Sequence, residues 1–154
     1  MPGLEGFTIG SALLSPTRTY LPLMAKLFRE VGRKRILGLI HCSGGGQTKI
    51  GKFGQKGIVY VKDNLFPVPP LFQLLKDVRS LSWQEAYASY NMGHRLEAVV
   101  PNGAVADECI AVAKSCGIDA RTVGRVDKNR ENPRGREVAI TNPEGSVIYY
   151  PFEG

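Results

Sequence analysis

Three consecutive glycines, Gly44–Gly46, are the feature that most restricts how this chain can fold. They follow an apolar run, residues 36–40, which predicts a buried strand. Ordering a glycine in regular structure costs roughly 0.5–1 kcal/mol relative to alanine. A triplet therefore predicts a backbone path that side chains would block. The path is either a tight turn or a cradle of backbone N–H groups that binds an anion.

A strand, a glycine-rich bend and a turn of helix, in this order, expose several N–H groups to one point, which is typical of phosphate sites. The segment from Gly46 to Lys52 also fits the first part of a Walker A loop. Phe53 stands where that motif needs a hydroxyl for Mg²⁺, so we exclude a P-loop ATPase. His41 precedes the bend and is either structural or catalytic. The second histidine, His94, lacks neighbouring carboxylates or cysteines, so we predict no zinc site.

Apolar periodicity and turn residues predict an alternation of helices and strands. We expect helices over residues 17–31, from 71 onward, over 83–90 (with a Ser82/Glu85 capping box) and over 104–115. We expect strands over residues 36–42, 58–61, 95–100, 120–126, 136–141 and 146–150. This order predicts an α/β or α+β fold with a mixed sheet. The length of 154 residues predicts a single domain, with a loose lead-in at 1–10 and a mobile loop at 127–135.

The net charge of +6 favours anionic partners, from nucleotides to nucleic acid. Basic runs at 33–35 and 125–136 have no interleaved aromatic residues and no recognised module, so we interpret them as solvated surface and predict no nucleic-acid partner. No apolar stretch approaches the ~20 residues of a membrane helix, and we predict no membrane partner. Three cysteines, an odd number, predict no disulfide framework and a reducing, cytoplasmic compartment. We expect Cys109 and Cys116 to face the core.

Four segments stand in the order and spacing of one known family: "LLSPTRTY" (13–20), "HCSGGGQT" (41–48), "FPVPPLFQLL" (66–75) and "YNMGHRLEAVV" (90–100). Together they resemble the C-terminal domain of phosphoribosylformylglycinamidine cyclo-ligase, also called aminoimidazole ribonucleotide synthetase. The resemblance runs from about residue 9 to residue 126. Four ordered motifs are far more specific than any one of them.

The resemblance implies a three-layer α/β/α sandwich with a mixed sheet, forming the C-terminal half of a two-domain enzyme. Such enzymes use ATP to close the imidazole ring of formylglycinamidine ribonucleotide, giving aminoimidazole ribonucleotide in purine biosynthesis. ATP and Mg²⁺ are expected to be bound mainly by the N-terminal domain, which also carries the contact of a homodimer. This chain is expected to lack that domain and to be inactive in isolation.

The resemblance also implies roles for individual residues. His41 would be catalytic, and the substrate phosphate would be held by Ser43, Gly44, Gly45, Gly46, Gln47, Asn91 and Gly93. No metal ligand is implied in this chain. The sequence departs from the family at residues 47–53, which read QTKIGKF in place of LTENIPR. An alternative interpretation is a stand-alone phosphate-ligand-binding or regulatory domain, and a third is a superfamily relative that acts on other small acids or carbonyls.

Overall fold

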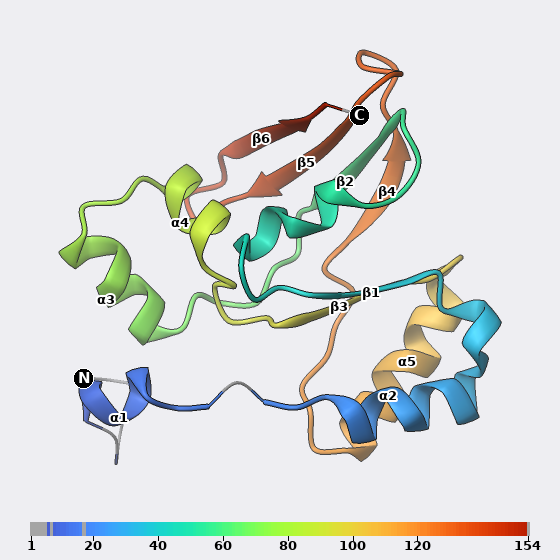
Figure 1. Ribbon diagram of the computed structural model, residues 1–154, viewed down its shortest axis with the longest axis horizontal. Coiled ribbons are helices and arrows are strands. Elements are labelled where there is room, and N and C mark those ends of the chain that lie inside the picture. Colours follow the sequence, from blue (N-terminus) through green and yellow to red (C-terminus); the bar gives the residue numbers. More distant parts are fainter. Residues whose placement is uncertain (1–5, 7, 17, 154) are drawn as a thin grey trace. The chain divides into compact units, whose positions relative to one another are not determined.

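The computed structural model describes residues 6, 8–16 and 18–153, which form helices and two separate sheets (Figure 1). The residues group into two compact units. The larger unit comprises Cys42–Arg95 and Val123–Gly154 together with the N-terminal segment Met1–Ser15, and the smaller one comprises Pro16–His41 and Leu96–Thr122. The predicted α/β class is confirmed.

The smaller unit contains a two-stranded antiparallel sheet and a helical layer. Its elements in chain order are α2 (Leu21–Leu27), the π-helix η1 (Phe28–Gly32), the 3-10 helix η2 (Arg33–Arg35), β1 (Gly38–His41), β3 (Leu96–Val99) and α5 (Gly103–Ser115). β1 pairs with β3 so that Gly38 lies opposite Val99. The predicted strands 36–42 and 95–100 are thus present in shortened form.

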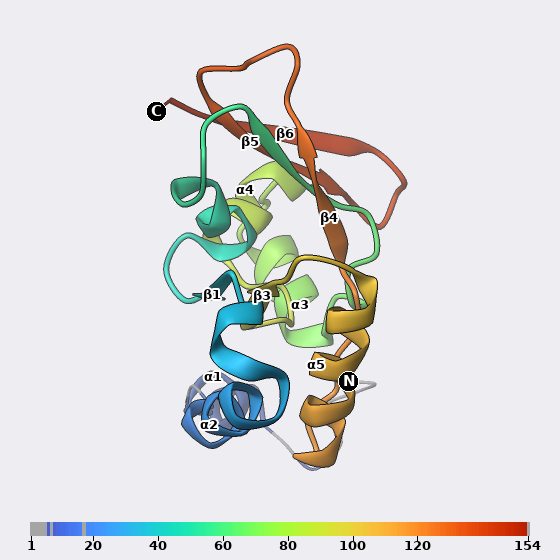
Figure 2. The same ribbon diagram turned by 90° about the vertical axis from the view of Figure 1, so that its right-hand side faces the viewer.

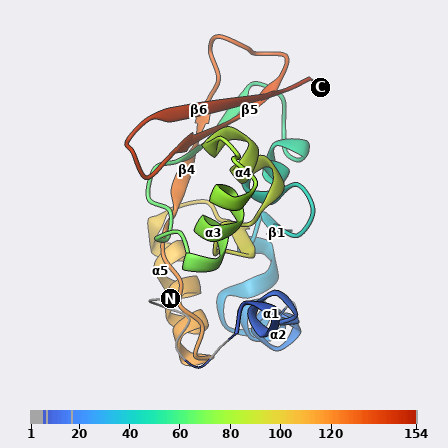
Figure 3. The ribbon, with the colours of Figure 1, turned by 90° about the vertical axis from the view of Figure 1, so that its left-hand side faces the viewer.

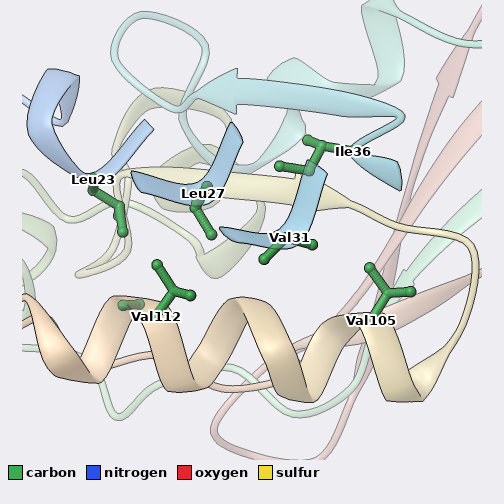
Figure 4. Close-up of a cluster of buried hydrophobic side chains, with 7 residues drawn as sticks. Leu23, Leu27, Val31, Ile36, Val105 and Val112 are labelled. Atoms are coloured by element: carbon green, nitrogen blue, oxygen red, sulfur yellow. The ribbon is translucent and has the colours of Figure 1, made fainter. Parts of the chain in front are cut away.

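A cluster of aliphatic side chains holds this unit together (Figure 4). It consists of Leu23, Leu27, Val31, Ile36, Val105, Val112 and Ala113, all at most 8% exposed. The side chains of α2 and η1 point toward those of α5. The helical spacing of Leu23, Leu27 and Val31 in the sequence is therefore explained by one buried stripe.

The larger unit is built on a four-stranded sheet with the order β4-β2-β5-β6. The strands are β4 (Gly124–Lys128), β2 (Ile58–Lys62), β5 (Arg136–Thr141) and β6 (Val147–Phe152). β2 and β5 are parallel, whereas β2–β4 and β5–β6 are antiparallel. The predicted mixed sheet is confirmed. Val138 and Ile140 of β5 are fully buried, which places the core of this unit beneath its central strands.

Two helices and a 3-10 helix accompany this sheet: α3 (Pro70–Val78), α4 (Trp83–Ser89) and η3 (Gly46–Lys52). Figure 3 views the unit from the side on which α4 lies. The predicted capping box is present at the start of α4, where the Ser82 hydroxyl accepts from the Glu85 N–H and the Glu85 carboxylate accepts from the Ser82 N–H. These two bonds satisfy N–H groups that the first helical turn would leave without partners.

Two loop predictions need correction. The predicted strand 120–126 begins only at Gly124 and continues to Lys128, into the segment predicted to be a mobile loop. The remainder of that segment is fixed by asparagine side chains, because Asn129 Oδ1 accepts from the Asn132 N–H and Asn132 Oδ1 accepts from the Gly135 N–H. Short asparagine side chains can replace backbone partners in turns, so a polar segment need not be mobile.

The N-terminal lead-in and the cysteines differ in part from expectation. Residues 1–5 and 7 lie outside the described residues, but Ile9 and Gly10 begin the short helix α1 (Ile9–Leu13). All three cysteines are free, and Cys42 is buried. Cys109 packs against the core as predicted, whereas Cys116, the residue after α5, is exposed, so the prediction for it is wrong. Within the described chain, no helix has the length and apolar character needed to span a membrane.

Candidate functional site

The three glycines form a left-handed bend between β1 and η3. Their φ angles are +66° at Gly44, +95° at Gly45 and +51° at Gly46. Residues with a Cβ rarely adopt this region, and doing so costs roughly 1–2 kcal/mol each. All three positions therefore favour glycine for its backbone conformation, but only at Gly46 would neighbouring atoms block a side chain.

The glycines nevertheless serve different purposes. Gly46 is buried, and a Cβ there would lie 2.5 Å from Tyr90 O and 2.9 Å from Tyr90 N, and would also collide with Tyr87 O. Gly46 thus allows η3 to pack directly on the end of α4. At Gly44, which is exposed, a Cβ would meet nothing within 4 Å. The tight-turn interpretation therefore explains Gly46. Gly44 and Gly45 form the open end of the bend.

The open end of the bend has unused donors and occupied acceptors. Lys49 Nζ donates to Ser43 O at 2.9 Å, and Thr48 Oγ1 donates to Gly45 O at 3.0 Å. The N–H groups of Gly44 and Gly45 donate to no other residue in the described part of the chain. Free N–H groups beside an ammonium group form an electropositive surface that suits an anion. We call Ser43, Gly44, Gly45 and Lys49 the glycine cradle.

Gln47 is buried behind the cradle, not exposed within it. Its Nε2 donates to Asn91 O and, at 3.0 Å, to His94 O. Its backbone carbonyl and Oε1 accept from Lys62 Nζ at 2.6 and 3.1 Å. Gln47 and Lys62 are 0% and 3% exposed, so both amide hydrogens of Gln47 are used inside the protein. Gln47 connects η3, β2 and the turn after α4, which makes it a positioning residue.

The turn after α4 forms the second side of the site. Asn91 Oδ1 accepts from the Gly93 N–H at 3.0 Å, and Met92 has a positive φ of 49°. At Gly93 a Cβ would lie 2.8 Å from Pro69 Cγ and Cδ. This contact places the proline-rich segment against the turn, and Gly46 and Gln47 place the turn against the glycine bend. Three of the four motifs quoted from the sequence therefore meet in the larger unit.

His41 belongs to the smaller unit, as the last residue of β1. It is half-buried, and its ring lies 5.9 Å from that of Tyr20 in an edge-to-face arrangement. Residues 16–20 of the fourth motif (13–20) also fall in this part of the chain, and Thr17 is outside the described residues. His41 is joined to the cradle through the chain by Cys42 alone.

Two lysines of the site escaped the sequence prediction. Lys49 falls in the segment that fits the first part of a Walker A loop, and Lys62 lies one residue beyond the predicted strand 58–61. Lys62 could have been found, because it is in phase with Ile58 and Tyr60 on the inward face of β2, where a lysine needs partners. Among the described residues, no group of three His, Cys, Asp or Glu side chains could hold a metal ion.

Comparison with known proteins identifies the relatives of this chain. It is 32% identical over 124 residues to phosphoribosylformylglycinamidine cyclo-ligase of Shouchella clausii, and 30% identical over 132 residues to that of Geobacter sulfurreducens. The enzyme of Methanopyrus kandleri is 28% identical over 126 residues. The chain is homologous to one part of the phosphoribosylformylglycinamidine cyclo-ligases. The resemblance predicted from the four motifs is confirmed.

The matches extend over most of this chain but over a minor part of each relative. They cover 79–83% of the chain and 34–36% of the three cyclo-ligases, so the chain spans about a third of their length. This share is what one domain of a larger enzyme would give. No family model matches the chain.

A solved structure supports the fold independently. E. coli HypE, a hydrogenase maturation protein, superposes with a TM-score of 0.62 over 86% of this chain and 39% of its own, at 19% identity. At that identity the similarity concerns the fold alone.

Proposed function

We propose that this chain provides the substrate-phosphate-binding part of a phosphoribosylformylglycinamidine cyclo-ligase. The observation that carries the proposal is the glycine cradle, in which the N–H groups of Gly44 and Gly45 have no partner among the described residues and lie beside the Lys49 ammonium group. Formylglycinamidine ribonucleotide carries one phosphate, and the cradle offers the donors and the charge that a phosphate requires. The homologous cyclo-ligases supply the identity of the substrate.

Binding the phosphate would contribute to catalysis by positioning. Holding a non-reacting group fixes the distance and angle between the reacting atoms. Their freedom of movement is then lost when the substrate binds, and it no longer has to be lost in reaching the transition state. Ser43, Gly44 and Gly45 would contact the phosphate directly. Gly46, Gln47 and the turn Asn91–Gly93 would keep the cradle in place, because their backbone contacts determine where η3 begins.

His41 is proposed to bind the substrate or to transfer a proton during ring closure. Its place next to Cys42 keeps it within a few residues of the cradle along the chain. An imidazole can donate or accept a proton near neutral pH, which suits closure of a ring between an amidine and an amide. The alternative is a structural role, and the effect of His41→Ala on turnover distinguishes the two.

ATP supplies the activation of the amide oxygen in this reaction. We propose, from the resemblance to the cyclo-ligases, that Mg²⁺, most of the ATP site and the contact of a homodimer belong to the N-terminal domain of the two-domain enzyme. On this proposal the chain alone catalyses nothing, and the whole enzyme acts in the cytoplasm.

The matched test compares two exposed glycines that both lie in the left-handed region. Gly44 and Gly145 both have positive φ, +66° and +84°, and both have open space where a Cβ would stand. Aspartate tolerates this region better than most residues. Gly44→Asp should abolish binding of formylglycinamidine ribonucleotide in calorimetric titration, because its carboxylate fills the cradle and repels phosphate. Gly145→Asp adds the same charge in the β5–β6 turn and should leave binding unchanged.

Three outcomes can be distinguished. Loss of binding in Gly44→Asp alone supports the cradle. Equal binding by Gly44→Asp and the parent refutes it. Failure of the parent to bind shows that this chain does not hold the substrate by itself, and the titration with the complete enzyme then decides between a shared site and an unrelated function.

A further inference from the structure

A second surface lies at the other end of η3 from the glycine cradle. The turn 51–57 precedes β2, and the segment 128–136 connects β4 to β5. Gly57 N donates to Gly135 O at 2.7 Å, Asn129 N donates to Gly57 O at 2.8 Å, and Arg136 Nε donates to Gly51 O at 2.9 Å. Figure 2 shows both segments at the same end of the larger unit. Two stretches about 75 residues apart in sequence thus form one surface.

This surface holds most of the excess positive charge of the chain. The two segments contain six basic residues and a single acidic one, Glu131, in a chain whose net charge is +6. Five of the basic side chains are exposed and form no ion pair within the described structure: Lys52, Lys56, Lys128, Arg130 and Arg134. Arg35 and Arg125, elsewhere on the molecule, are neutralised by carboxylates.

An exposed aromatic ring lies within the same turn. Phe53 is 51% exposed, although its backbone is fixed by bonds from its N–H to Ile50 O and from Tyr60 Oη to its carbonyl. A large apolar ring held on a rigid backbone costs little additional ordering when it binds a partner. The basic segments showed no interleaved aromatic residue in the sequence because residue 53 lies far from residues 128–136 along the chain.

We propose that this surface, defined by Lys52, Phe53, Lys56, Lys128, Arg130 and Arg134, binds single-stranded nucleic acid. The basic side chains contact backbone phosphates, and one unstacked base stacks on the Phe53 ring. A single-stranded partner is favoured over a duplex, because the bases of a duplex are already stacked and offer no free face to an isolated ring. This inference is independent of the proposed cyclo-ligase function.

The charge contribution is tested with two double variants of equal net charge. Binding is followed by fluorescence anisotropy of a labelled oligouridine of about twelve nucleotides, within the usual site size of single-strand binders. Lys56→Glu with Arg130→Glu should weaken binding about tenfold or more at low salt and reduce the salt dependence. Lys34→Glu with Lys114→Glu changes exposed lysines of the smaller unit and should leave the affinity within about twofold of the parent.

The ring contribution distinguishes nucleic acid from other anionic partners. Phe53→Leu keeps an apolar side chain but removes the stacking face, and should weaken oligouridine binding about fivefold or more, while Phe53→Tyr should retain it. Absence of oligouridine binding at low salt overturns the proposal. The proposal is also overturned if polyglutamate binds as tightly as oligouridine and Phe53→Leu has no effect, because these results would indicate a general polyanion surface. Binding to phosphatidylserine vesicles without binding to oligouridine would also overturn it.

Discussion

The packing of Gly46 on the end of α4 leads to a quantitative prediction for Gly46→Ala. A methyl group at this position must share space with Tyr90 O and Tyr90 N, at 2.5 and 2.9 Å, and with Tyr87 O. These atoms are backbone, and Tyr90 N is itself bonded to Ala86 O at 2.8 Å. The end of α4 must therefore move, or η3 must separate from it.

The expected cost has two parts. Alanine at φ = +51° costs about 1–2 kcal/mol in backbone conformation. Displacing packed atoms adds about 1–3 kcal/mol, as in overpacked cores. Gly46→Ala should thus lower the free energy of unfolding of the larger unit by about 2–5 kcal/mol. Gly44→Ala, with a φ of +66° and open space, should cost only the conformational part, about 1–2 kcal/mol.

Urea unfolding followed by tryptophan fluorescence measures this difference in the relevant place. The chain has one tryptophan, Trp83, on α4, where its Nε1 donates to Glu144 at 2.8 Å and its ring stacks on Tyr87. Its emission therefore reports on the element that Gly46 contacts. If Gly46→Ala and Gly44→Ala lose equal stability, the close approach of η3 to α4 does not restrict residue 46 and the reasoning is refuted.

Other perturbations test the remaining parts of the structure. Gln47→Leu should destabilise the larger unit by about 1–3 kcal/mol, because Lys62 and two carbonyls lose a buried partner; a smaller loss in urea unfolding would argue against this network. The Leu27 side chain is 3% exposed in the core of the smaller unit. Leu27→Ala should therefore lower the free energy of unfolding, followed by far-UV circular dichroism, by about 2–5 kcal/mol. Bonds from Ser82 hold the pKa of Glu85 below its usual 4.5, so its stabilisation is present above that pH and is lost as the pH falls below it; the melting-temperature gap between the parent and Glu85→Gln should close on acidification. In the complete enzyme, His41→Ala should lower kcat well over tenfold if the imidazole transfers a proton. Unchanged kcat would show that the role of His41 is structural.

Local signals predicted much of the fold. The β5 boundaries, Arg136–Thr141, match the prediction because a short apolar run, residues 138–140, is followed by the Asn-Pro-Glu-Gly turn. In that turn Gly145 N donates to Asn142 O, as in a type I turn. The capping box likewise follows from two residues three apart. Such features depend on neighbours in sequence, which a single chain displays directly.

Features that depend on distant segments were not predictable. Only pairing with β2, from Ile58↔Lys128 to Lys62↔Gly124, determines that β4 includes the charged residues Asp127 and Lys128. The burial of Gln47 requires Asn91, His94 and Lys62, three residues from two other segments. The glycine triplet indicated an unusual backbone conformation. That Gly46 is sterically restricted and Gly44 is not depends on where α4 ends, which the triplet does not indicate.

The parallel pairing of β2 with β5 also determines the order in which the larger unit can form. Residues 58–62 pair with residues 136–140, so the two central strands are separated by more than seventy residues, including all of α5. During synthesis on a ribosome, β2 must wait with an unpaired edge until β5 has emerged. Long-range parallel pairing of this kind slows folding and exposes strands to aggregation in the interval. The interval between the synthesis of β2 and the emergence of β5 is therefore the period in which chaperone protection of this chain would matter most.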